Sequence, residues 1–168
     1  MEELIGKLKT KARTTLSEKI IGEVKDYIDK VIRPPRSEFG DMPVCPFAGP
    51  ELDSGNLMID VVVPGEVSLV DLIQKFLQSG KQSALFAQLG GEELTAEDTK
   101  QYQKFVNRVL KEHGAKGYKC ICFNPNDRDT NINGFNPRAE APYFLINIAG
   151  REELHKAHKT LKKSKYYD

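Results

Sequence analysis

The sequence has 168 residues, of which 39% are hydrophobic and 29% are charged, so it suits one domain with one core and is not a disordered chain. A formal net charge of +1 gives no reason to expect nucleic acid as a partner, because domains that bind nucleic acid usually present a strongly basic face. Three cysteines do not suggest a disulfide scaffold, so the fold must depend on packing.

Residues 1–33 are predicted to form a long amphipathic helical segment, either one helix or two joined ones. Apolar side chains recur at every fourth position from Leu4 to Ile32, and Pro34 with Pro35 ends the pattern. At about 1.5 Å per residue such a helix is about 45 Å long, which exceeds the width of a compact domain of this size. We therefore expect it to bend, to project, or to pair with a second copy of the chain in a homodimer.

Residues 34–168 are predicted to form an α/β domain that opens with an irregular segment. Prolines and glycines recur between residues 36 and 56 and favour a loop without helices or strands. The next stretch, residues 57–63, is rich in β-branched side chains and stops at Pro64-Gly65, which is typical of a buried strand. The domain is therefore expected to begin with a loop that leads into its first strand.

Two amphipathic helices with capping signals follow. The first begins at a capping box that starts at Ser68 and ends at Gly80, and the second spans residues 96–113 after a capping box at Thr95. Between them, residues 83–89 form a short apolar stretch that suits either a strand or a helix. The glycines and the capping box that follow it favour a strand.

The remaining elements are two strands and a short closing helix. Residues 118–123 and 143–148 have the composition of strands, and residues 151–161 are predicted to be helical. Strands that alternate with helices indicate parallel crossovers, and the last two strands, joined without a helix, are expected to be antiparallel. The sequence thus predicts a single α/β domain with a mixed sheet of about four strands covered by helices, together with the long N-terminal helix.

Cys45 is the first candidate for chemistry. It lies in the proline-rich loop ahead of the first strand, where it would serve as a nucleophile or a thiolate ligand if a neighbouring cation lowered its pKa. The alternative is a small buried hydrophobic residue. Cys120 and Cys122 are expected to point to opposite faces of one strand, one in the core and one in solvent, and their spacing gives zinc little support.

His155 and His158 form the second candidate, because their spacing places both imidazoles about one helical turn apart. They are predicted to bind a metal jointly, or one of them alone would serve as an axial ligand of haem. The alternative is that both are exposed to solvent among the surrounding lysines, which include Lys162 and Lys163.

The long segment 124–138 is the third candidate, since long connections inside compact domains often bind ligands. Arg128 or Arg138 is predicted to clamp a carboxylate or a haem propionate, because a guanidinium matches paired oxygens. Asp127 or Asp129 would hold a substrate amine. An ordinary surface loop is the alternative.

Two stretches of the chain carry a resemblance to known families. With Val-Cys-Pro-Phe-Ala at residues 44–48, an apolar strand after it and residues 141–148 near the end, the chain resembles uncharacterised bacterial domain families that have a Cys-Pro-Phe start and an aromatic-aliphatic final strand. It also looks remotely similar, over roughly residues 42–160, to the YqcI/YcgG family, which includes haem-dependent arginine N-hydroxylases.

This resemblance implies a haem-dependent oxidoreductase that N-oxygenates a small amine or a guanidine-type metabolite. Under this hypothesis His155 or His158 is the axial ligand, and Cys45 lies near the cofactor. The cations near the haem propionates would be Arg138 with Lys162 or Lys163.

Two other functions stay open from the sequence. One is a non-catalytic module that binds haem or another small ligand, and the other is an interaction protein whose long helix pairs with another chain. No apolar stretch reaches the roughly 20 residues that span a bilayer, and the acidic first residues lack the pattern of a secretory signal. We therefore expect a cytoplasmic protein with no membrane partner.

Overall fold

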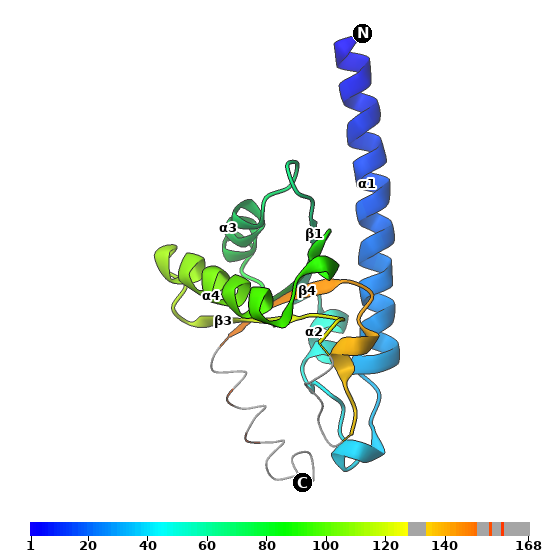
Figure 1. The fold of residues 1–168 in the computed structure, drawn as a ribbon, viewed down its shortest axis with the longest axis vertical. Helices are drawn as coiled ribbons and strands as arrows, with labels where there is room; N and C mark the ends of the chain where they lie inside the picture. The colour runs from blue at the N-terminus through cyan, green and yellow to red at the C-terminus, as the bar shows by residue number, and fades with distance from the viewer. Residues whose placement is uncertain (128–133, 151–154, 156–158, 160–168) are drawn as a thin grey trace.

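The computed structural model describes residues 1–127 and 134–150 together with His155 and Lys159. Four strands form its mixed sheet (Figure 1): β1 (Leu57–Val62), β2 (Ser83–Gln88), β3 (Tyr118–Phe123) and β4 (Phe144–Gly150). Their order is β1-β2-β4-β3, in which β1 and β2 are parallel and β4 is antiparallel to both of its neighbours. The predicted α/β class with a mixed sheet of about four strands is confirmed, as is the antiparallel final pair.

Two helices, α3 (Leu69–Ser79) and α4 (Ala96–Glu112), cover one face of the sheet. Capping closes their first turns, since the Ser68 hydroxyl accepts a backbone hydrogen bond at 3.0 Å and Thr95 forms a capping box with Asp98. Alternate side chains of β4 pack into the apolar core beneath the two helices: Phe144, Ile146 and Ile148.

The other face of the sheet is covered by the C-terminal part of α1 (Glu2–Tyr27), by the π-helical turn η1 (Ile28–Ile32) and by α2 (Ala48–Ser54). The second set of alternate strand side chains packs against these helices. This second core includes the following residues: Ile20, Val24, Ile28, Val61, Leu85 and Leu145. The sheet is therefore a central layer with apolar packing on both faces.

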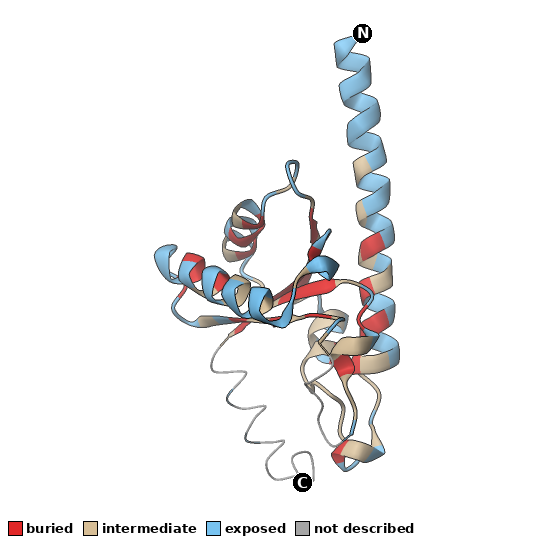
Figure 2. Cartoon of the chain, viewed as in Figure 1, coloured by how far each residue is buried: buried red, intermediate tan, exposed pale blue. Residues whose placement is uncertain are grey.

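The predicted long N-terminal helix is present, because η1 continues α1 as far as Ile32. Its N-terminal part projects beyond the sheet and is exposed along most of its length (Figures 1 and 2). Leu4 and Leu8 are 56% and 59% exposed, so the first half of the predicted apolar stripe does not pack against the domain. No helix in the described residues is long and apolar enough to cross a membrane.

The segment from residue 36 to residue 56 departs from the predicted irregular loop, because it contains α2 and a 3-10 turn, η2 (Ser37–Phe39). Pro50 lies in the first turn of α2, where its missing N–H removes no intrahelical hydrogen bond. Gly55 ends the helix with a φ of 76°, in the left-handed region that glycine adopts most easily. Proline and glycine at these positions delimit a short helix rather than prevent one.

The ambiguous stretch 83–89 forms strand β2, so the favoured prediction is confirmed. The predicted helix 151–161 lies outside the described residues apart from His155 and Lys159, both of which are helical. Two more 3-10 turns connect the elements: η3 (Gly91–Glu93) and η4 (Pro137–Glu140).

Candidate functional site

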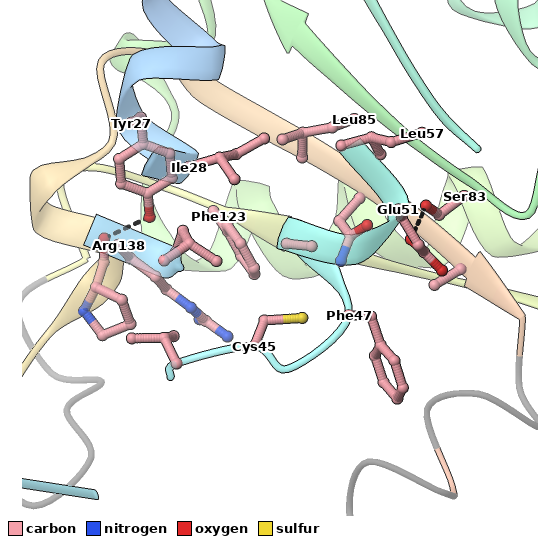
Figure 3. A pocket seen from close by; sticks show the side chains of 16 residues that line it. Tyr27, Ile28, Cys45, Phe47, Glu51, Leu57, Ser83, Leu85, Phe123 and Arg138 are labelled. Carbon is pink, nitrogen blue, oxygen red and sulfur yellow. Dashed lines mark hydrogen bonds between the residues drawn. The ribbon is translucent and has the colours of Figure 1, made fainter. Parts of the chain in front are cut away.

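A cavity of about 200 Å³ lies between the α1-facing side of the sheet and the chain that covers it (Figure 3). The strands form its floor, and its roof comes from η1, the segment around Cys45 and the start of α2. Small side chains contribute to the hollow, because Ser83 in β2 pairs with Ala149 in β4 and neither fills the space beneath α2. Most of the wall is apolar: Ile28, Ile32, Val44, Leu57, Leu85 and Phe123.

Cys45 contributes its thiol to the roof of the cavity. Burial raises the pKa of this thiol, and hydrogen bonds from the backbone N–H groups of Phe47 and Ala48 offset that effect only in part. The neutral thiol is therefore the stable form near neutral pH, whereas a nucleophile or a metal ligand needs the thiolate. Cys45 lies at a cavity, but its surroundings do not activate it for the predicted chemistry.

Arg138 extends its guanidinium to one end of the cavity (Figure 3). Turn η4 holds its backbone, because the Asn136 side chain accepts hydrogen bonds from the N–H groups of Arg138 at 3.0 Å and Ala139 at 3.3 Å. Nη1 donates to Asp127 Oδ2 at 3.2 Å, and the guanidinium carbon lies 5.5 Å from the centre of the Phe123 ring. These contacts fix one edge and one face of the guanidinium, and its other donors make no hydrogen bond within the described residues.

Two hydrogen bonds tie the covering helices to their surroundings. Tyr27 donates its hydroxyl hydrogen to Pro137 O at 2.7 Å and so joins the end of α1 to η4. Burial raises the pKa of Tyr27 well above its ordinary value, which keeps the hydroxyl a donor. At the other end of the cavity, Ser83 donates to the Glu51 carboxylate and joins β2 to α2 (Figure 3). Together these bonds fix the dimensions of the cavity.

Asn147 is a cavity residue that the sequence analysis did not single out. It stands in the middle of β4, paired with Leu85 on one side and Ile121 on the other. Its side chain is half-buried and makes no hydrogen bond within residues 1–127 and 134–150. A half-buried amide without a partner in the described residues is available to bind water or a ligand, so Asn147 marks a polar contact point inside the cavity.

A signal for Asn147 does exist in the sequence. The strand Phe144–Gly150 is apolar except for this one amide. Because side chains alternate along a strand, Asn147 shares its face with Leu145 and Ala149, and that face is covered by α1. One polar residue on the buried face of a central strand is therefore a sequence feature that indicates a cavity beside that strand.

The structure brings together two of the predicted site residues, since Cys45 and Arg138 both line the cavity. His155 is helical and exposed, and it does not line the cavity. The predicted role of His155 as a haem ligand near Cys45 stays a prediction. Other predicted residues lie outside the described part of the chain: Arg128, Asp129, His158, Lys162 and Lys163.

The cavity as described does not fit a haem. Its volume of about 200 Å³ is below the roughly 300–1,000 Å³ of sites for drug-sized ligands, and a haem is a larger macrocycle than such ligands. Its described lining contains no imidazole, and Cys45 favours the neutral thiol. No group of three or more metal-ligating side chains occurs among the residues that the structure describes. The roles predicted for His158, Lys162 and Lys163 stay predictions.

Cys120 and Cys122 lie on the opposite face of the sheet from the cavity, in the core under α3 and α4. Their sulfur atoms are 3.8 Å apart, and both residues are buried. The expectation that they point to opposite faces is wrong, because side chains two positions apart in a strand share a face. The contact with Cys122, together with burial, raises the pKa of Cys120, so this pair is a packed and inert part of the core.

No protein-family model, curated protein or solved structure matches this chain. The resemblance to the YqcI/YcgG family therefore stays a prediction, and the function has to be inferred from the cavity itself.

Proposed function

We propose that this protein is a small-ligand-binding module whose ligand occupies the cavity beneath η1 and α2. The observation that carries this proposal is a largely apolar cavity with an amide, Asn147, that has no hydrogen-bond partner in the described residues. Small-molecule sites have this composition, since an apolar wall supplies most of the binding and a few polar groups fix the orientation. An ordinary core would place an apolar side chain at position 147.

The size of the cavity limits the ligand. An apolar cavity of about 150 Å³ accommodates a molecule the size of benzene. The present cavity, at about 200 Å³, therefore accommodates one ring with a small substituent, or a branched aliphatic molecule of similar size.

Binding without catalysis agrees best with the chemistry of the lining. A general base that works near neutral pH is most often an imidazole, and none is among the described lining residues. The Cys45 thiol stays protonated, because burial and the negative charge of Glu51, which also lines the cavity, both raise its pKa. The cavity therefore supplies recognition groups rather than an activated thiol.

Nuclear magnetic resonance of the full chain with benzyl alcohol as the probe tests this proposal. We expect saturable shifts of the β2 and β4 amides, with a dissociation constant of about 1 mM. Ala149→Leu fills the cavity and should abolish these shifts, whereas Ala96→Leu makes the same change at an exposed position and should leave them intact. Ala48→Leu is a second blocking variant from the roof of the cavity. Absence of saturable shifts in the wild type, or unchanged shifts in both blocking variants, would contradict the proposal.

A second candidate function is self-association through the N-terminal part of α1. It is supported by the exposed apolar residues Leu4, Ile5, Leu8 and Leu16, which lie in a part of the helix that no other described segment covers. Sedimentation equilibrium over a range of protein concentrations measures the mass of the full chain. Leu8→Glu should convert a dimer into a monomer, and Thr10→Glu, on the other side of the helix, should not. A monomeric wild type at all concentrations would refute this candidate.

A further inference from the structure

We infer that the ligand of the cavity carries a carboxylate and that the Arg138 guanidinium binds it. This inference rests on the proposed function, because it names the chemical class of the ligand in the same cavity. A guanidinium in a mostly apolar wall needs a reason, since burying a charge is unfavourable unless it is paired. Asp127 supplies part of that pairing through Nη1 alone.

The geometry of Arg138 leaves room for a second carboxylate. A guanidinium has five N–H donors in a planar fork and can bind a carboxylate through two parallel hydrogen bonds. Asp127 engages Nη1, and Phe123 lies against the group at 5.5 Å. The side chain remains 26% exposed and lines the cavity, so its other donors are accessible to a ligand. Asp127 then acts as a positioning residue that orients the fork.

Phe123 and Asn147 are suitably placed for the rest of such a ligand. Phe123 pairs with Leu145 across the sheet, so Asn147 is its diagonal neighbour on the same face, at a Cβ separation of somewhat less than about 7–8 Å. Arg138 lies against the Phe123 ring, so the guanidinium and the Asn147 amide both neighbour this one aromatic side chain. A small molecule that lies along this wall can reach both groups.

The charged residues around the cavity attract an anionic and a cationic ligand to different ends of it. Glu51 lies at the end of the cavity away from Arg138, bonded to Ser83 (Figure 3). Asp127 offsets part of the Arg138 charge, but an anion that accepts hydrogen bonds from the other guanidinium donors lies closer to Arg138 than to either carboxylate. An amine would prefer the Glu51 end. An amine ligand is therefore the direct competitor of this inference.

Three probes of similar shape separate these possibilities: benzoate, benzyl alcohol and benzylamine. At pH 7 they carry negative, zero and positive charge on the same ring. We expect benzoate to bind the full-length wild type about tenfold or more tightly than benzyl alcohol, and benzylamine no more tightly than benzyl alcohol, as measured by chemical-shift titration. Raising the salt concentration should weaken benzoate binding alone.

Two variants distinguish ligand recognition from a structural ion pair. In Arg138→Gln, benzoate should bind only about as tightly as benzyl alcohol, and the affinity for benzyl alcohol should be the same as in the wild type. Asp127→Asn removes the partner charge and should keep or increase the preference. If Arg138 only pairs with Asp127, both variants will lower the melting temperature and neither will change the affinity ratio. Should Arg138→Gln fail to fold, Arg138→Lys retains charge without the fork and should lose most of the preference.

The outcomes separate the two proposals. If none of the three probes binds, the proposed function itself is wrong. Binding of all three with equal affinity would leave the small-ligand module intact and overturn the carboxylate inference, and tighter binding of benzylamine would overturn it in favour of an amine.

Discussion

At the centre of β4, Asn147 carries an amide that has no hydrogen-bond partner within residues 1–127 and 134–150. Replacing a half-buried polar group of this kind by an apolar one of similar size removes the part of its desolvation cost that burial imposes. We therefore predict that Asn147→Leu raises the free energy of unfolding by about 1 kcal/mol. The same change should weaken the binding of benzyl alcohol, because the hydroxyl group loses a partner.

Urea unfolding at constant temperature measures this change in stability. Ile148→Val, on the other face of the same strand, is the matched control and should lower the free energy of unfolding by about 1 kcal/mol. Loss of stability in Asn147→Leu would mean that the amide makes a structural hydrogen bond and does not await a ligand.

Residue chemistry alone identified part of this site. Cys45 and Arg138 were predictable as candidates because a thiol in a proline-rich loop and a guanidinium in a long loop are distinctive side chains in distinctive places. Their meeting at one cavity was not predictable, since it depends on how α2 and η4 fold over the sheet. The protonation of Cys45 was also beyond the sequence, because the burial that raises its pKa exists only in the folded chain.

Among the elements, the junction of α1 with η4 determines where Arg138 stands. The Tyr27 hydroxyl donates to Pro137 O at 2.7 Å in a buried position, one residue before Arg138. Tyr27→Phe leaves that carbonyl without its partner, so we predict a loss of about 1–2 kcal/mol in the free energy of unfolding. The benzoate preference should fall as well, because η4 is held less firmly.

Tyr143→Phe is the control for this prediction. Its hydroxyl also bonds α1, through Glu23 at 2.5 Å, but this residue is less buried than Tyr27, so its loss should lower stability by less than about 1 kcal/mol. Chemical denaturation of both variants and thermal melts measure the difference. Equal losses in the two variants would show that the buried hydroxyl has no special role in joining α1 to η4.

The elements differ in how far their sequences determine them. Helices α3 and α4 have both an apolar stripe and a capping signal, so local chemistry and tertiary packing agree and the prediction succeeds. Helix α2 has neither, and its one glycine and one proline suggest a loop. The helix forms because the sheet provides a surface on which Leu52 and Ala48 pack. The long helix was predictable in length, whereas the projection of its first half depends on where the sheet ends.

At the scale of the whole molecule, the fold keeps several weak acids in their neutral form. Burial raises the pKa of Cys45 and of Tyr27, and contact with Cys122 together with burial raises the pKa of Cys120. Each group therefore binds its proton more tightly in the folded chain than in the unfolded chain, where cysteine and tyrosine ionise near their usual values of about 8.5 and 10. Because of these protons, the free energy of unfolding depends on pH under alkaline conditions.

The sign of this coupling follows from the protons bound in each state. Above pH 8.5 the unfolded chain has lost protons that the folded chain retains, so the free energy of unfolding falls as pH rises, by up to about 1.4 kcal/mol per pH unit for each such proton. Below that pH both the folded and the unfolded chain hold these protons, so these groups do not make the free energy of unfolding depend on pH. We predict a flat stability between pH 7 and about 8, followed by a fall that steepens near pH 10 when tyrosine ionises in the unfolded chain.

Urea unfolding at a series of alkaline pH values measures this slope directly. The double variant Cys45→Ala/Tyr27→Phe lacks two of the raised groups, so its stability should be lower at pH 7 but should fall less steeply above pH 9. The two curves therefore converge as pH rises. Parallel curves would mean that neither group titrates differently in the folded and unfolded chains. The cavity would then be open to water in solution, since burial is the largest cause of both raised pKa values.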